Sequence, residues 1–203
     1  IAVILGVAVG LIAGYRRGWL DAIVSRLIDV VLAIPYLLLA LGLAASCSFG
    51  EGCAGGLIQP GIGVVTFVIA ITSWTYIARI VRGETLALRE AEFVESARAA
   101  GASHTAIVLR EILPNLAAPV IVYASILVPQ VILFEAALSF LGVGVQAPTP
   151  SWGQMLSDGA ATFDSAWWYM LFPGLAIVGT VLSLNLVGDA LRDALNPRQR
   201  LIR

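Results

Sequence analysis

Apolar runs of membrane length recur along this chain and constrain its fold more than any other feature. Five runs stand out, at residues 1–14, 27–46, about 61–82, about 115–141 and about 168–189. Apolar residues make up 59% of the sequence and charged residues only 12%, against roughly a quarter charged in soluble domains. Because backbone polar groups in lipid must be satisfied internally, each run is expected to form a helix. The expected fold class is an all-α polytopic membrane protein, a single transmembrane domain over residues 1–203.

The distribution of arginine sets the expected orientation. Arginine supplies all twelve basic residues, whereas the connections 47–60 and 142–167 contain none. By the positive-inside rule, the segments that contain arginine are expected to face the cytoplasm, and the C-terminus is one of them. The expected location is the inner (plasma) membrane of a bacterial cell. Residue 1 then starts outside, so an earlier part with one more span, six in all, is expected. The arginines that carry this prediction are Arg16, Arg17, Arg26, Arg79, Arg82, Arg89, Arg98, Arg110, Arg192, Arg198, Arg200 and Arg203.

The cytoplasmic connection 84–113 is polar yet regular. Residues from Glu84 to Ala100 favour helix, and Gly101 can adopt the left-handed conformation that ends one. Ser103 is a good N-cap for a second helix running to Leu113 before Pro114. Small residues crowd the turn, which favours docking in a groove of another protein; the alternative is packing against the chain's own spans. The small residues are Ser96, Ala97, Ala99, Ala100, Gly101 and Ala102.

The two extracytoplasmic connections carry separate signals. In the connection 142–167, Ser151 followed by Gln154 forms a capping box, which predicts a short helix from Trp152 to about Ala161. This helix could form a lip that another protein meets, or it could plug the outer end of the spans. In the connection 47–60, Cys47 and Cys53 meet an oxidising compartment, so a disulfide is expected, with two free thiols as the alternative. No metal site is expected, because no histidine lies nearby.

Polar side chains within the apolar runs are costly in lipid and therefore informative. Glu135 could line a path, act in gating or hydrogen-bond to a neighbouring span, and Asn185 has the same alternatives of path lining and interhelical hydrogen bonding. Asp29 and Asp189 lie near inner helix ends, where Arg26 and Arg192 are expected partners.

The cytoplasmic connection contains Glu95-Ser96-Ala97, then Gly101, then Leu113-Pro114. With these residues at this spacing, it resembles the hallmark loop of ABC importer permeases. It departs from the general pattern at Ser96 and at Glu111, although a polar residue often precedes Ile-Leu-Pro in one subfamily. That subfamily is the second permease of dipeptide and oligopeptide importers, which the chain resembles over essentially its whole length. The stretches that carry the resemblance are Glu95 to Asn115, Ser139-Phe140-Leu141-Gly142-Val143-Gly144-Val145-Gln146, Pro150-Ser151-Trp152-Gly153 and Asp189-Ala190-Leu191-Arg192-Asp193.

The resemblance implies half of a translocation path for peptides or similar small solutes. The implied partners are a second homologous permease, two cytoplasmic ABC ATPases and an extracytoplasmic substrate-binding protein, all assembled in membrane lipid. Relatives carry dipeptides, longer peptides, glutathione and nickel complexes. The residues implied in ATPase coupling are Glu95, Ser96, Ala97, Ala100, Gly101, Ala102, Leu113 and Pro114.

Other function classes find less support. The sequence has no lysine and no Gly-rich phosphate loop, so no enzyme activity and no cofactor are expected in this chain, with ATP and magnesium bound by partner ATPases. An ion-coupled carrier could use Glu135 or Asp29 but does not need the Gly101 loop. A membrane-tethered DNA-binding protein could use the helix pair around Gly101, but the second of these helices contains only one arginine. Binding to nucleic acid is therefore not expected. His104 lacks the second ligand or nucleophile that a hydrolase requires.

Overall fold

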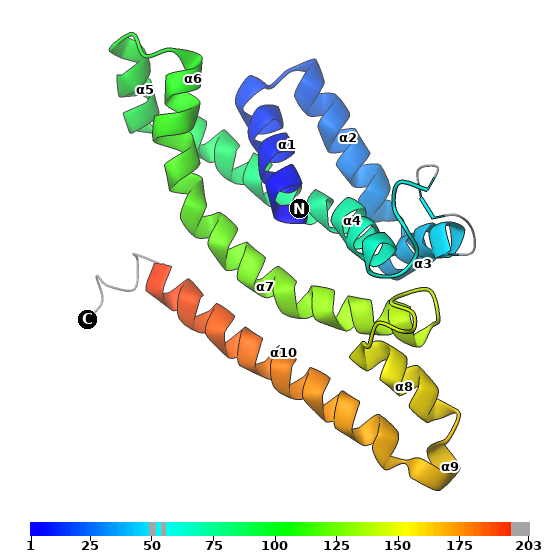
Figure 1. Cartoon of the computed structure of the whole chain (residues 1–203). Coiled ribbons are helices and arrows are strands. Elements are labelled where there is room, and N and C mark those ends of the chain that lie inside the picture. The colour runs from blue at the N-terminus through cyan, green and yellow to red at the C-terminus, as the bar shows by residue number, and fades with distance from the viewer. Residues whose placement is uncertain (49–51, 54–55, 196–203) are drawn as a thin grey trace. The chain divides into compact units, whose positions relative to one another are not determined.

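The computed structural model describes residues 1–48, 52–53 and 56–195. Every regular element within these residues is helical, apart from a single β-bridge between Cys53 and Ile58. This confirms the predicted all-α class. Arg198, Arg200 and Arg203, used above for orientation, lie outside the described residues. The elements are α1 (Ala2–Arg16), α2 (Trp19–Ala33), α3 (Tyr36–Ser48), α4 (Ile62–Arg89), α5 (Glu92–Ala99), α6 (His104–Ala106), the π-helical turn η1 (Ile107–Ile112), α7 (Leu113–Phe140), α8 (Trp152–Ala160), α9 (Phe163–Ala166) and α10 (Trp168–Leu195) (Figure 1).

Three of the described helices are long and apolar enough to cross a membrane. These are α4, α10 and the continuous helix His104–Phe140, which is formed by α6, η1 and α7. The pair α2 and α3 would add a fourth if it forms one broken span, and α1 is a shorter apolar helix of 15 residues. The number of spans therefore stands at three or four by helix length, where the sequence predicted five.

The predicted single run 27–46 is two helices, with a break at Ile34 and Pro35. Pro35 has no N–H to continue the helical ladder, and its ring disfavours helical geometry at the residue before it. Ile34 accordingly takes extended angles, φ −84° and ψ 131°. The helix restarts as α3 at Tyr36, directly after the proline.

The chain divides into two compact units. The first comprises Ile1–Ile34 and Ser73–Ala124. Within it, Gly6, Gly10 and Gly14 of α1 lie against the second half of α4. A Cβ placed on Gly10 would be 2.5 Å from the Ala78 carbonyl oxygen, and similarly close contacts meet a Cβ on the other two glycines. The three glycines therefore allow the helix backbones to approach more closely than any side chain would permit.

The second unit comprises Pro35–Thr72 and Ser125–Arg203. Its core joins α3, the start of α4 and the end of α7. The rings of Tyr36 and Phe134 lie 4.1 Å apart between centroids. Helix α8 packs on α10 and also approaches α7, where a Cβ on Gly153 would lie 2.3 Å from the Ala136 carbonyl oxygen. The buried core residues are Ala40, Ala44, Cys47, Cys53, Val64, Val68, Phe134, Leu138 and Val143.

Candidate functional site: the turn between α5 and α6

Helix α5 is shorter than the sequence indicated. The predicted helix from Glu84 to Ala100 is instead the end of α4 and the separate helix α5, with Glu90 and Ala91 between them. The N–H groups of Glu90 and Ala91 donate to carbonyls three residues back, and Ala91 is extended, with ψ 147°. Val94 of α5 is fully buried, and α5 as a whole packs against η1. Packing thus overrides the helix propensity of this stretch.

Gly101 ends α5 in the left-handed conformation predicted for it, with φ 83°. Its N–H donates to the Arg98 carbonyl at 3.0 Å, and the N–H of Ala102 reaches the Ala97 carbonyl, also at 3.0 Å. This pair of bonds is the Schellman motif, which satisfies the last free carbonyls of a helix. The N-cap prediction is also confirmed, because the Ser103 hydroxyl accepts from the Ala106 N–H at 3.3 Å. Two hydrogen-bonded ends therefore fix the turn between α5 and α6.

The turn presents small residues to its surroundings. Glu95, Ser96, Ala100, Gly101 and Ala102 are exposed, and Ala97 is partly buried. A Cβ on Gly101 would meet no atom within 4 Å. The turn is therefore rigid through its backbone and open on its outer face, as a docking surface requires.

Leu113 and Pro114 lie apart from this turn. The predicted helix end before Pro114 is wrong, because the helix runs from His104 through η1 to Phe140 without a stop. A proline ring normally clashes with the carbonyl four residues earlier. Here the preceding turn is π-helical, and the Leu113 N–H donates to the Val108 carbonyl five residues back. We attribute the continuation to this wider turn, which accommodates Pro114 near the start of α7.

Glu135 takes part in a hydrogen-bonded chain at the end of α7. Its carboxylate accepts from the Ser139 hydroxyl at 2.7 Å, and the same hydroxyl accepts from the Val145 N–H at 2.9 Å. Ser139 and Val145 are buried, whereas Glu135 is partly buried. Asn185 is an exposed residue of α10, and no hydrogen bond joins it to Glu135 among the described residues. The geometry thus favours a packing role for Glu135 and leaves the path-lining role of both residues as a prediction.

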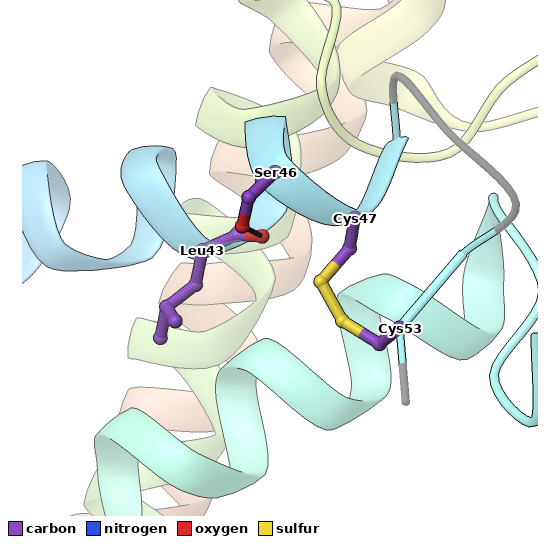
Figure 2. The surroundings of a disulfide bond; sticks show 4 residues. All are labelled: Leu43, Ser46, Cys47 and Cys53. Atoms are coloured by element: carbon purple, nitrogen blue, oxygen red, sulfur yellow. Dashed lines mark hydrogen bonds between the residues drawn. A yellow bond between two sulfur atoms is a disulfide. The ribbon is translucent and has the colours of Figure 1, made fainter. Parts of the chain in front are cut away.

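A disulfide joins Cys47 at the end of α3 to Cys53, as Figure 2 shows. The two Cα atoms are 4.8 Å apart, and both residues are buried. Cys53 also pairs with Ile58 through two backbone hydrogen bonds of 3.0 and 3.3 Å, and the Ser46 hydroxyl donates to the Leu43 carbonyl. The disulfide therefore links the end of α3 to the segment that leads into α4. In the connection 142–167, α8 confirms the predicted helix, and the Ser151 hydroxyl accepts from the Gln154 N–H at 3.1 Å.

Contacts between helices supply residues that sequence reasoning missed. Asp29 pairs with Arg79 of α4 at 2.5 Å, and not with Arg26 as expected. Asp21 of α2 pairs with Arg82 through two hydrogen bonds. The four-residue spacing of Gly6, Gly10 and Gly14 is the signal that could have identified α1 as a close-packing helix. No comparable local signal identifies the acid–arginine pairs, because their members lie 50 and 61 residues apart.

The fold resembles that of a transporter component. A chain of the MetNI methionine ABC transporter, solved in inward-facing conformations, superposes with a TM-score of 0.74 at 20% sequence identity. The match covers 96% of this chain and 88% of that chain. Together with its long apolar helices, this places the chain in the class of multi-pass helical membrane proteins with the fold seen in that transporter.

The chain belongs to the family described as binding-protein-dependent transport system inner membrane component, whose model matches residues 6–201. It is 42% identical over 199 residues to the dipeptide transport system permease protein DppC of Alkalihalophilus pseudofirmus, covering 98% of this chain and 62% of that protein. It is 44% identical over 183 residues to the oligopeptide transport system permease protein OppC of Escherichia coli, covering 90% and 57% respectively. The glutathione transport system permease protein GsiD of Pectobacterium atrosepticum is 40% identical over 198 residues, covering 98% and 62%. The chain thus spans about three-fifths of the length of these relatives.

Proposed function

We propose that this chain is a transmembrane permease subunit of an ATP-binding-cassette importer and forms half of a translocation path. Family membership supports the transport role, and the exposed, hydrogen-bonded turn at Gly101 is the observation that carries the coupling role. The names of the relatives point to dipeptides, oligopeptides and glutathione, so the proposed cargo is a peptide or a similar small solute.

The proposed mechanism transmits ATPase closure through α5. The chain enters α5 from α4 and leaves it, through α6 and η1, into α7. A partner ATPase that binds the residues around Gly101 would therefore transmit its movement to two membrane helices, α4 and α7, at once. The packing of α5 against η1 would let α5 move together with the start of the long helix. Coupled rigid-body movement of this kind can switch a path between inward and outward access.

ATP and magnesium are proposed to bind to partner subunits. The complex would contain a second homologous permease, two cytoplasmic ATPases and an extracytoplasmic substrate-binding protein. Under the proposed orientation the C-terminus is cytoplasmic, and the α8 region and the disulfide face outward, where α8 could meet the binding protein. Leu113 and Pro114 would act indirectly, since they shape the helix that follows residues 100–103, the turn that we call the docking turn.

The experiment that tests this proposal is uptake by the reconstituted complex. The full protein is placed in vesicles with its partner subunits, and labelled peptide uptake is followed with ATP, without ATP, and with an imposed proton gradient alone. We expect uptake with ATP and binding protein only. Uptake driven by the gradient without ATP would support an ion-coupled carrier and contradict the proposal.

A further inference from the structure

A basic pocket lies in the first unit, beside the docking turn. Its volume is about 450 Å³, and it is lined by Tyr15, Arg16, Arg89, Arg98 and His104. These residues come from the end of α1, the end of α4, from α5 and from the start of α6. None of the described residues that line the pocket carries a carboxylate. Three guanidinium groups around one cavity create a positive potential that favours an anion.

Contacts among the lining residues hold one wall of this pocket in place. The Arg89 guanidinium donates to the Tyr15 backbone carbonyl at 2.7 Å and lies 5.8 Å from the centre of the Tyr15 ring. The Tyr15 hydroxyl is 2.8 Å from Nδ1 of His104. Arg16 and Arg98 are more exposed. Arginine offers a planar pair of N–H groups that matches phosphate oxygens, so the pocket suits a phosphate group better than a small halide.

A second, smaller pocket of about 230 Å³ adjoins the first and is mainly apolar. The two pockets share Tyr15, Arg16 and His104. The apolar residues of the second pocket are Leu11, Ile12, Val108 and Leu109. Of these, Ile12 and Leu109 are more than half exposed. A charged cavity therefore opens beside an apolar one, a pairing that fits an amphiphilic ligand.

The order of the two pockets along the helices matches the depth of a membrane. Leu11 and Ile12 precede Tyr15 by about one helical turn, and Val108 and Leu109 follow His104 by about one turn. With the arginine-rich ends in the cytoplasm, both apolar pairs lie on the membrane side of the basic pocket. A ligand held here has its charge at the inner surface and its apolar part in the hydrocarbon.

We propose that these two pockets form a binding site for an anionic phospholipid of the inner leaflet. The lipid phosphate is held between Arg16 and Arg98, and an acyl chain runs along Leu109 and Ile12. Basic pockets between membrane helices at this depth are suited to such headgroups. The site rests on the proposed orientation, and it places a lipid headgroup against Arg98 of α5. The lipid would thereby steady the helix that carries the docking turn.

Retention of lipid by the full complex tests this site. The complex is placed in nanodiscs containing equal parts phosphatidylglycerol and phosphatidylcholine, extracted into mild detergent, and analysed for retained lipid by native mass spectrometry. We expect phosphatidylglycerol to be retained in preference, and Arg16→Gln to lower its retention about fivefold. Adding Arg98→Gln should lower it further, Leu109→Gln should weaken it through the apolar pocket, and Arg16→Lys should restore part of it. Arg110→Gln is the matched control, since Arg110 is an exposed arginine that lines neither pocket.

Several results would overturn the proposal. One is equal retention of phosphatidylglycerol by wild type and by the folded double variant, with folding and assembly checked by size exclusion. Another is displacement of the lipid by millimolar inorganic phosphate, which would assign the site to a free anion. A third is retention by the permease pair but not by the complex with its ATPases, which would assign the pocket to an acidic segment of a partner. Because lipid retention is measured without ATP or cargo, its failure is distinguishable from failure of the transport function.

Discussion

The Ser139 hydroxyl joins two parts of the second unit through a single oxygen atom. It donates to Glu135 one turn back and accepts from the Val145 N–H beyond the end of α7. Gly142, at φ 81°, turns the chain so that Val145 can reach it. Leaving the buried Val145 N–H without an acceptor would cost about 1–3 kcal/mol. Glu135 orients the hydroxyl in this arrangement, which explains how a carboxylate is accommodated among apolar residues.

Glu135→Gln separates the charge of this side chain from its hydrogen bond. The amide oxygen can still accept from Ser139, so we expect normal assembly, with reduced uptake if the negative charge acts in gating. Purified complex yield and vesicle uptake are measured together. Ser139→Ala is the control for packing and should lower thermal stability. Poor assembly of Glu135→Gln with normal uptake by the surviving complex would show that the residue is purely structural.

At the scale of elements, the packing of α1 against α4 depends on glycine more than on any large apolar residue. Each of its three glycines lies where α4 leaves no space for a side chain, and the nearest α4 atoms at Gly10 are backbone atoms. Backbone cannot rotate away as a side chain can. The position of α1 is therefore sensitive to a single added methyl group.

Gly10→Ala should detach α1 from α4 or shift it, at a cost of about 1–3 kcal/mol, because the new Cβ would lie 2.5 Å from the Ala78 carbonyl oxygen. Thermal unfolding of the detergent-solubilised protein measures the loss. Gly83→Ala is the matched control, since a Cβ on this α4 glycine meets no atom within 4 Å and alanine favours helix. Equal stability of the two variants would contradict the close packing.

The disulfide is a second feature that holds elements together, because it closes a short loop between α3 and α4. We expect Cys47 and Cys53 to be oxidised in the cell. Mass spectrometry after alkylation without reductant should find neither thiol modified, and two alkylated thiols would refute the bond. Replacing both cysteines with serine should cost about 2 kcal/mol, since the closed loop is short.

Local signals in the sequence predicted three element ends correctly, although the helix end predicted before Pro114 was wrong. The left-handed Gly101, the N-cap Ser103 and the capping box at Ser151 each act through backbone groups within a few residues. The missed features depend on which helices face one another. A single sequence does not say that Arg79 faces Asp29, or that a π-helical turn will accommodate Pro114.

At the scale of the whole molecule, the chain carries long apolar helices and an exposed turn at Gly101, and it spans about three-fifths of the length of its relatives. Apolar composition and the positions of arginine predicted the helical membrane class and an orientation. The roles of Glu95, Gly101 and the neighbouring small residues follow from the family resemblance, and their exposure is compatible with docking. The proposed function therefore depends most on one claim, that this turn couples the permease to an ATPase.

Gly101→Asp tests that claim most directly. A residue other than glycine costs about 1 kcal/mol or more at this left-handed position, and its side chain would project from the open face that should enter the ATPase groove. Gly61→Asp is the matched control, because Gly61 has φ 99° and equally open surroundings. It lies directly before α4, at the end of that helix that is proposed to face away from the ATPase. Glu95→Gln should give a milder defect than Gly101→Asp.

The measurement is ATPase stoichiometry, binding-protein-stimulated ATP hydrolysis and peptide uptake in the purified complex. We expect Gly101→Asp to insert in the membrane normally, to recruit less ATPase and to abolish stimulated hydrolysis and uptake, while Gly61→Asp retains all three. Normal uptake by Gly101→Asp with a stably bound ATPase would contradict the coupling role of the turn.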